Sequence, residues 1–136
     1  MLVYAHHRGS EWHVNAREQI GSLGPSGGPW AIPWPCIHEF LAVTTNARLF
    51  RSSNSLAAAI DQVEAWMESP SLRLLGELQG HWSELKSVLV AGKFTGSSIH
   101  DARIAALCRE HGVTELWTAD RDFSRASGIR TRNPLI

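Results

Sequence analysis

The sequence predicts an α/β fold with three layers, α/β/α, around a short and mainly parallel sheet. Short apolar runs alternate along the chain with longer segments in which apolar residues recur at helical spacing. Parallel strands need crossover connections of about a dozen residues, and the predicted helices supply connections of that length. With 136 residues and 43% apolar composition, the chain has material for one core, so we expect a single domain over residues 1–136.

The first half of the chain predicts two strands and three helices. Apolar runs at residues 1–5 and 30–34 indicate the strands, and the glycines and prolines of residues 24–29 indicate a loop. The helices are expected to begin near Ser10, Pro35 and Ser55, each of which is typical of a helix start. The inward face of the third helix is predicted to hold Leu56, Ile60, Val63 and Trp66 or Met67.

The second half predicts three strands and two helices. Strands are expected over residues 72–75, 115–118 and 128–131, and residues 119–125 indicate an acidic turn. One helix closes at Gly92 and has Trp82, Leu85, Val88 and Leu89 on its apolar face. The other covers residues 101–112, with Gly112 as its C′ residue. Its predicted apolar face holds Ile104, Leu107, Cys108 and His111.

Acidic side chains fall where open α/β sheets place their ligand sites, beyond the carboxyl ends of the strands. Glu39 lies inside the second predicted helix, Asp101 opens the later one, and Asp120 and Asp122 follow a strand. Several carboxylates at one point repel each other unless a divalent cation neutralises them, and oxygen ligands favour Mg²⁺ or Mn²⁺. Taken singly, Asp101 fits a helix-dipole role, Glu39 a solvated helix residue, and the other two fit turn residues.

The formal net charge is +0, with 13 basic and 13 acidic residues, so a polyanionic partner must be held by a local patch. Four arginines near the acidic turn have two interpretations: they hold phosphates, or they solvate an edge strand. These are Arg121, Arg125, Arg130 and Arg132.

Cysteine and tryptophan usage adds three expectations. The two cysteines have no CxxC spacing and the chain shows no secretory leader, so we expect a reduced, cytoplasmic setting. No apolar run approaches the roughly 20 residues that cross a bilayer. Trp66 and Trp82 are predicted to be core residues, whereas Trp30 and Trp34 are candidates for a dimer or partner interface.

Three short motifs resemble the PIN-domain family, and more narrowly the VapC-type toxins, and the resemblance runs over nearly the whole chain. They are HEF at 38–40, HDARIAAL at 100–107 and TADRDF at 118–123. The resemblance implies a small α/β domain in which four acidic residues bind Mg²⁺ or Mn²⁺ and cleave RNA. Glu39, Asp101 and Asp120 match three of the four acidic positions, and Thr118 and Asp122 match accompanying positions with a supporting role.

The resemblance also implies partners and a role. We expect a metal-dependent endoribonuclease, the toxin of a type II toxin–antitoxin pair, with RNA as its substrate and Arg121 and Arg125 as candidate RNA contacts. A cognate antitoxin would place a segment in the active groove, and the chain would form a homodimer without a membrane anchor.

The departure from the family pattern lies at the front of the chain. Similar sequences carry an acidic D-x-N tripeptide just ahead of the segment that matches residues 2–5, and here only Met1 precedes it. Either the true start lies upstream or this copy has lost its first metal ligand. Loss of one carboxylate removes roughly 4 kcal/mol of Coulombic attraction for the cation at an effective dielectric constant of about 20. This form is therefore expected to bind metal weakly and to turn over little RNA.

Two alternatives follow from the sequence. The first is a catalytically silent PIN-fold protein that acts through antitoxin or dimer binding, which the missing aspartate supports. The second is a phosphoacceptor receiver domain, which normally needs a lysine on a late strand. The last lysine of this chain is Lys93, which disfavours a receiver domain.

Overall fold

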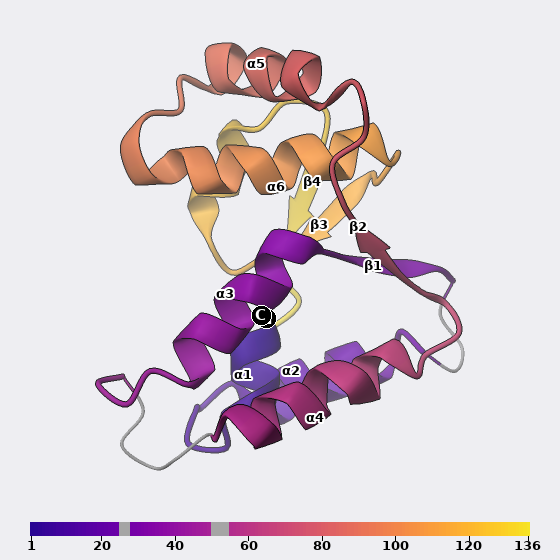
Figure 1. The fold of residues 1–136 in the computed structure, drawn as a ribbon, viewed down its shortest axis with the longest axis vertical. Coiled ribbons are helices and arrows are strands. Elements are labelled where there is room, and N and C mark those ends of the chain that lie inside the picture. Colours follow the sequence, from indigo (N-terminus) through magenta and orange to yellow (C-terminus); the bar gives the residue numbers. More distant parts are fainter. Residues whose placement is uncertain (25–27, 50–54) are drawn as a thin grey trace. The chain divides into compact units, whose positions relative to one another are not determined.

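A computed structural model describes residues 1–24, 28–49 and 55–136 of the chain. The chain divides into two compact units, one formed by residues 1–74 with Leu135 and the other by residues 75–134 with Ile136. Figure 1 labels the α-helices and β-strands of both. Part of the predicted loop at residues 24–29 lies outside the described residues.

Among its described residues, the first unit contains four helices and the strand β1, which pairs with β2. In chain order its elements are α1 (Leu2–His6), α2 (His13–Gly21), β1 (Trp30–Pro33), α3 (Trp34–Thr44), α4 (Leu56–Met67) and β2 (Leu72–Leu75), the last residue of which belongs to the second unit. The predicted strands at residues 30–34 and 72–75 are confirmed. The predicted helix beginning near Pro35 is also confirmed, with Pro35 in its first turn.

The strand predicted at residues 1–5 is wrong, because this segment forms the short helix α1. The Ala5 and His7 amides donate to the carbonyls of Met1 and Val3, at 3.1 and 2.8 Å. A run of five apolar residues fits a strand and a buried helical turn equally well, so periodicity does not decide between them. Helix α2 begins at His13 rather than near Ser10, whose hydroxyl instead accepts the Trp12 amide in the preceding turn.

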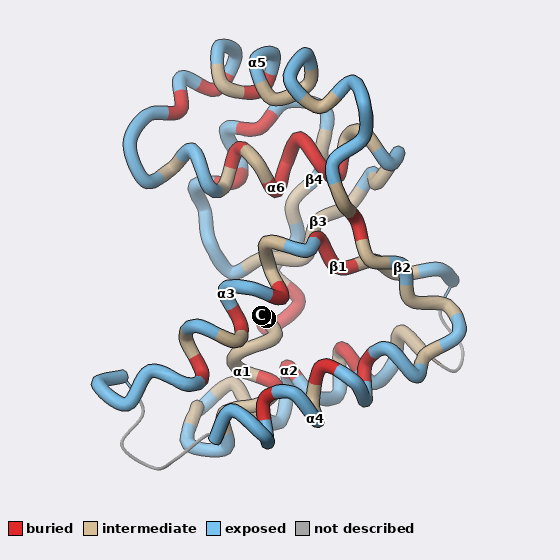
Figure 2. The backbone as a smooth tube through the Cα atoms, in the orientation of Figure 1, coloured by how far each residue is buried: buried red, intermediate tan, exposed pale blue. Residues whose placement is uncertain are grey.

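The core of the first unit forms around Phe40 of α3, whose side chain is 1% exposed. Its ring meets those of His6 and Trp66 edge to face, with centroids 5.3 and 4.9 Å away. Figure 2 shows the buried positions as red segments facing inward on the helices of this unit. The surrounding buried residues are Ala5, Ala16, Ile20, Ile32, Ile37, Ala59, Val63 and Leu135.

Helix α4 confirms one prediction and corrects another. Ser55 caps it, because its hydroxyl oxygen accepts a hydrogen bond from the Ala58 amide at 3.1 Å. The predicted inward face is only partly right: Val63 and Trp66 are buried together with Ala59. Leu56, Ile60 and Met67 are 59%, 42% and 42% exposed. The apolar face of this helix is wider than the part that packs inward, so the helical wheel does not decide which edge of that face is buried.

The second unit contains two long helices and two short parallel strands. Its elements are α5 (His81–Gly92), η1 (Gly96–Ser98), α6 (Ile99–Glu110), β3 (Glu115–Trp117), η2 (Arg121–Arg125) and β4 (Arg130–Arg132). Strands β3 and β4 pair in parallel, with Leu116 opposite Thr131. The strand predictions for 115–118 and 128–131 are therefore confirmed within two residues, and the predicted acidic turn is largely a 3₁₀ helix.

The apolar stripe of α6 is confirmed for Ile104, Leu107 and Cys108, each at most 5% exposed. The prediction that His111 belongs to this face is wrong, because His111 is exposed and its Nε2 lies 2.8 Å from the Gly76 carbonyl oxygen. Gly112 follows with a φ of +71°, as expected for a C′ residue. The prediction that Trp82 lies in the core is wrong, because its side chain is 66% exposed on α5.

Gly92 ends α5, as predicted. It also lies at a point of close backbone approach. A Cβ atom added there would lie 2.3 Å from Cε2 of Phe94 and 2.9 Å from the carbonyl oxygen of Arg125. The α5 terminus can therefore pass Phe94 and η2 only if residue 92 has no side chain.

The α/β class predicted from the sequence is confirmed. Within the described ranges, the strands form two separate pairs, β1 with β2 and β3 with β4, instead of one longer sheet. None of the helices in these ranges is long and apolar enough to cross a bilayer.

Candidate metal centre

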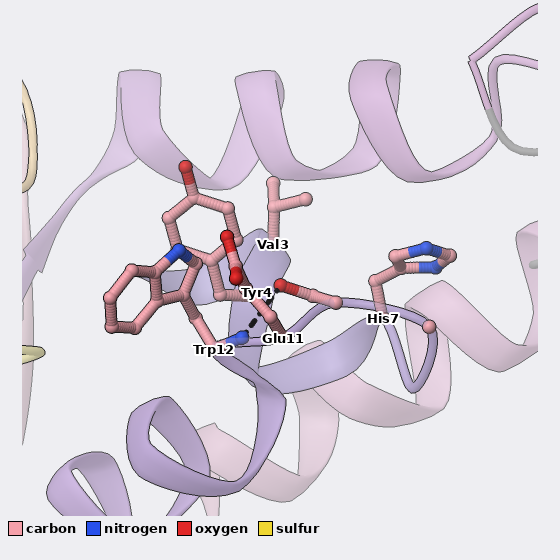
Figure 3. A pocket seen from close by; sticks show the side chains of 7 residues that line it. Val3, Tyr4, His7, Glu11 and Trp12 are labelled. Atoms are coloured by element: carbon pink, nitrogen blue, oxygen red, sulfur yellow. Dashed lines mark hydrogen bonds between the residues drawn. The ribbon is translucent and has the colours of Figure 1, made fainter.

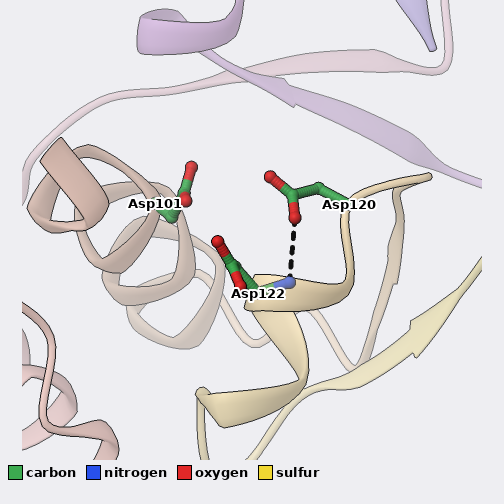
Figure 4. Close-up of side chains that lie close together, drawn as sticks. All are labelled: Asp101, Asp120 and Asp122. Carbon is green, nitrogen blue, oxygen red and sulfur yellow. Dashed lines mark hydrogen bonds between the residues drawn. The ribbon is translucent and has the colours of Figure 1, made fainter.

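Three aspartates from two segments of the second unit meet at one point. Asp101 lies in the first turn of α6, Asp120 is the N-cap of η2, and Asp122 lies in the first turn of η2. One carboxylate oxygen from each lies within 4.8 Å of the other two. Figure 4 shows Asp101 approaching from α6 and the other two from the turn that begins η2. Asp101 is half-buried, whereas Asp120 and Asp122 are exposed.

A short chain of hydrogen bonds shapes the turn that carries Asp120. The Thr118 amide donates to the Arg132 carbonyl at 2.9 Å, which fixes the turn to the end of β4. The Thr118 hydroxyl oxygen accepts the Asp120 amide at 3.0 Å, and Oδ1 of Asp120 accepts the Asp122 amide at 2.8 Å. Side chains of this kind cap turns and helix starts. Thr118 therefore positions the aspartates through the backbone.

Asp101 owes its position to the start of α6. The preceding turn η1 has a capping box, in which the Thr95 amide donates to the Ser98 hydroxyl at 3.0 Å. The buried stripe of α6 then fixes the helix by packing in the core of this unit. A carboxylate in a first turn also interacts favourably with the helix dipole, so the dipole role and the metal role can both apply to Asp101.

The donor set fits a small hard cation. Mg²⁺ binds oxygen at 2.0–2.1 Å in octahedral geometry, so ligand oxygens on one ion lie roughly 2.9 to 4.2 Å apart. The three aspartate oxygens, all within 4.8 Å of one another, reach this spacing by small side-chain rotations. Neighbouring carboxylates repel each other, and a divalent ion held between them would offset that repulsion.

Glu39, the remaining predicted ligand, lies on α3 in the first unit and is exposed. It acts electrostatically on the Met1 amino group: burial lowers the pKa of that group, and Cys36 and Glu39 oppose this change. Its meeting with the three aspartates remains a prediction.

The four arginines near the acidic turn differ in their contacts. Arg130 and Arg132 both pair with Glu115, whose pKa is lowered first by a hydrogen bond from the Trp117 indole and then by these arginines. Their ion pairs fit the interpretation that they solvate the edge strand β4. The Arg125 guanidinium lies 4.5 Å from the centre of the Phe94 ring. Arg121 is exposed and has neither an ion pair nor a hydrogen bond within the described ranges.

One feature of the first unit was not predicted. A pocket of about 510 Å³ lies where α1 turns into α2, and Tyr4 and Trp12 line it. Because residues 1–5 were expected to form a strand, the sequence indicated no common surface for these two rings. A helical assignment of this segment would have been the signal for it.

An α/β chain with such an acidic centre matches a known class, and this chain belongs to the PIN domain family, whose sequence model matches residues 1–129. Its relatives include Ribonuclease VapC48 of Mycobacterium tuberculosis, which is 32% identical over 99% of this chain and 93% of the relative. VapC ribonuclease Mb2897 of Mycobacterium bovis is 31% identical over 99% of this chain and 91% of the relative. Ribonuclease VapC37 of Mycobacterium tuberculosis is 28% identical over 98% of this chain and 92% of the relative. The resemblance predicted from the three motifs is confirmed.

Proposed function

We propose that this chain is a Mg²⁺- or Mn²⁺-dependent endoribonuclease and the toxin of a type II toxin–antitoxin pair. The observation that carries the proposal is the approach of three carboxylates, from α6 and η2, to within 4.8 Å of one another. The family supports the same reading, because the relatives named above are called VapC ribonucleases.

Each acidic residue has a stated role in this proposal. Glu39, Asp101 and Asp120 would be the catalytic carboxylates and would hold the cation together with Asp122, and Thr118 fixes the turn that presents Asp120. A bound divalent ion acidifies a water molecule and offsets negative charge on the phosphoryl oxygens. The side chains named here would hold such an ion at the turn that begins η2.

The RNA backbone needs a local cation, because the net charge of the chain is +0. Arg121 is the better candidate, since it lies between two of the aspartates in sequence and has no partner among the described residues. Arg125 is exposed but lies against the Phe94 ring, so it would need to share that contact with a phosphate.

The proposal includes a cognate antitoxin that blocks the acidic groove, a homodimer, a cytoplasmic location and one domain over residues 1–136. Of the two tryptophans predicted for an interface, Trp34 is 39% exposed. The Trp30 indole donates to the Ser69 hydroxyl at 3.1 Å within the first unit. Trp34 is therefore the stronger candidate for a dimer or antitoxin contact.

The test is RNA cleavage by the full chain with Mg²⁺ or Mn²⁺, compared with the same reaction in EDTA. Asp101→Asn should reduce cleavage to the EDTA level, because it removes one anionic ligand. Asp61→Asn is the matched control, since Asp61 is an exposed carboxylate on α4 away from the cluster in sequence.

Two results would contradict the proposal. Cleavage that persists in EDTA would exclude metal dependence. A folded chain that binds antitoxin but cuts no RNA with either metal would favour the alternative of a catalytically silent PIN-fold protein.

A further inference from the structure

The pocket of the first unit combines two aromatic rings with an unpaired carboxylate. Tyr4 and Trp12 line it together with Glu11, Ser10, Val3, His7 and Gly9. Figure 3 shows both rings and the Glu11 carboxylate toward one end of the pocket and His7 toward the other. Glu11 is exposed and has no hydrogen bond or ion pair within the described ranges, so it can accept hydrogen bonds from a ligand.

Two hydrogen bonds fix the turn that forms this pocket. Nδ1 of His13, in the first turn of α2, lies 3.1 Å from the Tyr4 carbonyl oxygen and connects the two helices. The Trp12 amide donates to the Ser10 hydroxyl oxygen at 3.1 Å. Both rings are half-buried, so each is partly ordered by packing while part of its surface stays open.

We propose that this pocket binds an unpaired guanine of the RNA substrate. Aromatic side chains stack nucleobases, and stacking by itself accepts any base. A carboxylate is an acceptor-only group with two oxygens, and the Watson–Crick edge of guanine presents two adjacent N–H donors. The other three bases present one donor position or a donor beside an acceptor, so Glu11 selects guanine.

The neighbouring charge favours RNA over a cationic protein segment. Arg8 lies in the same turn, is exposed and has no partner among the described residues. Arg8 lies between the pocket residues His7 and Gly9 in sequence, so we assign its guanidinium to the phosphate of the bound nucleotide, whereas it would repel a lysine or arginine side chain.

The guanine proposal rests on the ribonuclease proposal and adds a base preference to it.

The experiment measures RNA binding by fluorescence anisotropy in EDTA, where the full chain should not cut the probe. The probes are a labelled oligouridine and the same oligomer with one central guanosine. We expect the guanosine probe to bind about tenfold more tightly. Trp12→Ala and Glu11→Gln should both remove this preference, while Trp12→Phe should keep most of it. Trp82→Ala and Glu18→Gln, exposed residues of the same types outside this pocket, should leave it unchanged.

The outcomes separate this proposal from the ribonuclease assignment. Equal binding of the two probes, or a preference that survives both pocket substitutions, overturns the guanine site, and Mg²⁺-dependent cleavage would still support the ribonuclease. The guanine site is also overturned if the chain shows no guanosine preference and the peptide Gly-Arg-Gly competes with the RNA probe only while Glu11 is present. That result would assign the pocket to a cationic protein segment. A chain that neither binds nor cuts RNA overturns both proposals. Circular dichroism of each variant confirms that it is folded.

Discussion

Asp120→Asn removes one charge from the acidic cluster while keeping the shape of the turn. The asparagine side-chain oxygen can still accept the Asp122 amide, which Oδ1 of Asp120 accepts at 2.8 Å. The substitution should therefore separate the electrostatic role of this residue from its capping role. In the absence of metal we expect the variant to be more stable than the parent chain.

The expected gain follows from the geometry of the cluster. The three oxygens lie within 4.8 Å of one another, and at that separation two like charges repel by about 0.9 kcal/mol at the dielectric constant of water. Asp120 has two such neighbours, and a Debye length of about 8 Å roughly halves each repulsion at physiological salt. Asp120→Asn should raise the free energy of unfolding by about 1 kcal/mol, or the melting temperature by about 3 °C.

Metal should reverse this order. Mg²⁺ at 100 times its dissociation constant stabilises the parent chain by about 2.7 kcal/mol, and the variant should gain much less because it has lost an anionic ligand. Thermal unfolding in EDTA and in MgCl₂ measures both effects, with Asp61→Asn as the control. A variant that is less stable than the parent chain in EDTA, or that gains the same increment from Mg²⁺, would refute the reasoning.

Two further predictions concern stability. Burial raises the pKa of the Cys108 thiol to about 11 from 9.0, so the unfolded chain releases this proton first as the pH rises. The stability that Cys108 contributes is complete below pH 9 and is lost toward pH 11. Relative to Cys108→Ala, urea unfolding should show a loss of about 1.4 kcal/mol between pH 8 and 10, and a pH-independent difference would contradict it. Phe40→Ala should cost about 3 to 5 kcal/mol in the same assay, because Phe40 is 1% exposed, whereas exposed Val90→Ala should change little. Equal costs would show that Phe40 is not central to the core.

The sequence predicted the positions of helices α4 and α6 better than it predicted which residues they bury. In α6, Ile104, Leu107 and Cys108 are buried and Gly112 is the C′ residue, as predicted, but Ala105 and Ala106 are buried as well and His111 is exposed. In α4, tertiary packing chose Ala59 over Ile60 for the interior. The segment that became α1 was too short for its period to distinguish strand from helix.

The acidic residues were predictable because three motifs pointed to them together. The structure brings Asp101, Asp120 and Asp122 to one point, and their role as ligands stays a prediction. The hydrogen bonds that the Asp120 amide donates to Thr118 and the Asp122 amide donates to Asp120 were beyond the sequence, because they depend on backbone dihedrals that local composition does not fix. The pocket beside Trp12 was missed for the related reason that it depends on how two helices meet.

The close approach at Gly92 has a consequence for how this gene can vary. Every missense change at that codon adds at least a methyl group where the Phe94 ring and the Arg125 carbonyl already occupy the space. The Arg125 carbonyl belongs to the backbone and cannot move away as a flexible side chain can. Even alanine at residue 92 would therefore clash with it. If position 92 is randomised to all codons and the library is selected for folded protein, we expect almost all surviving clones to carry a glycine codon.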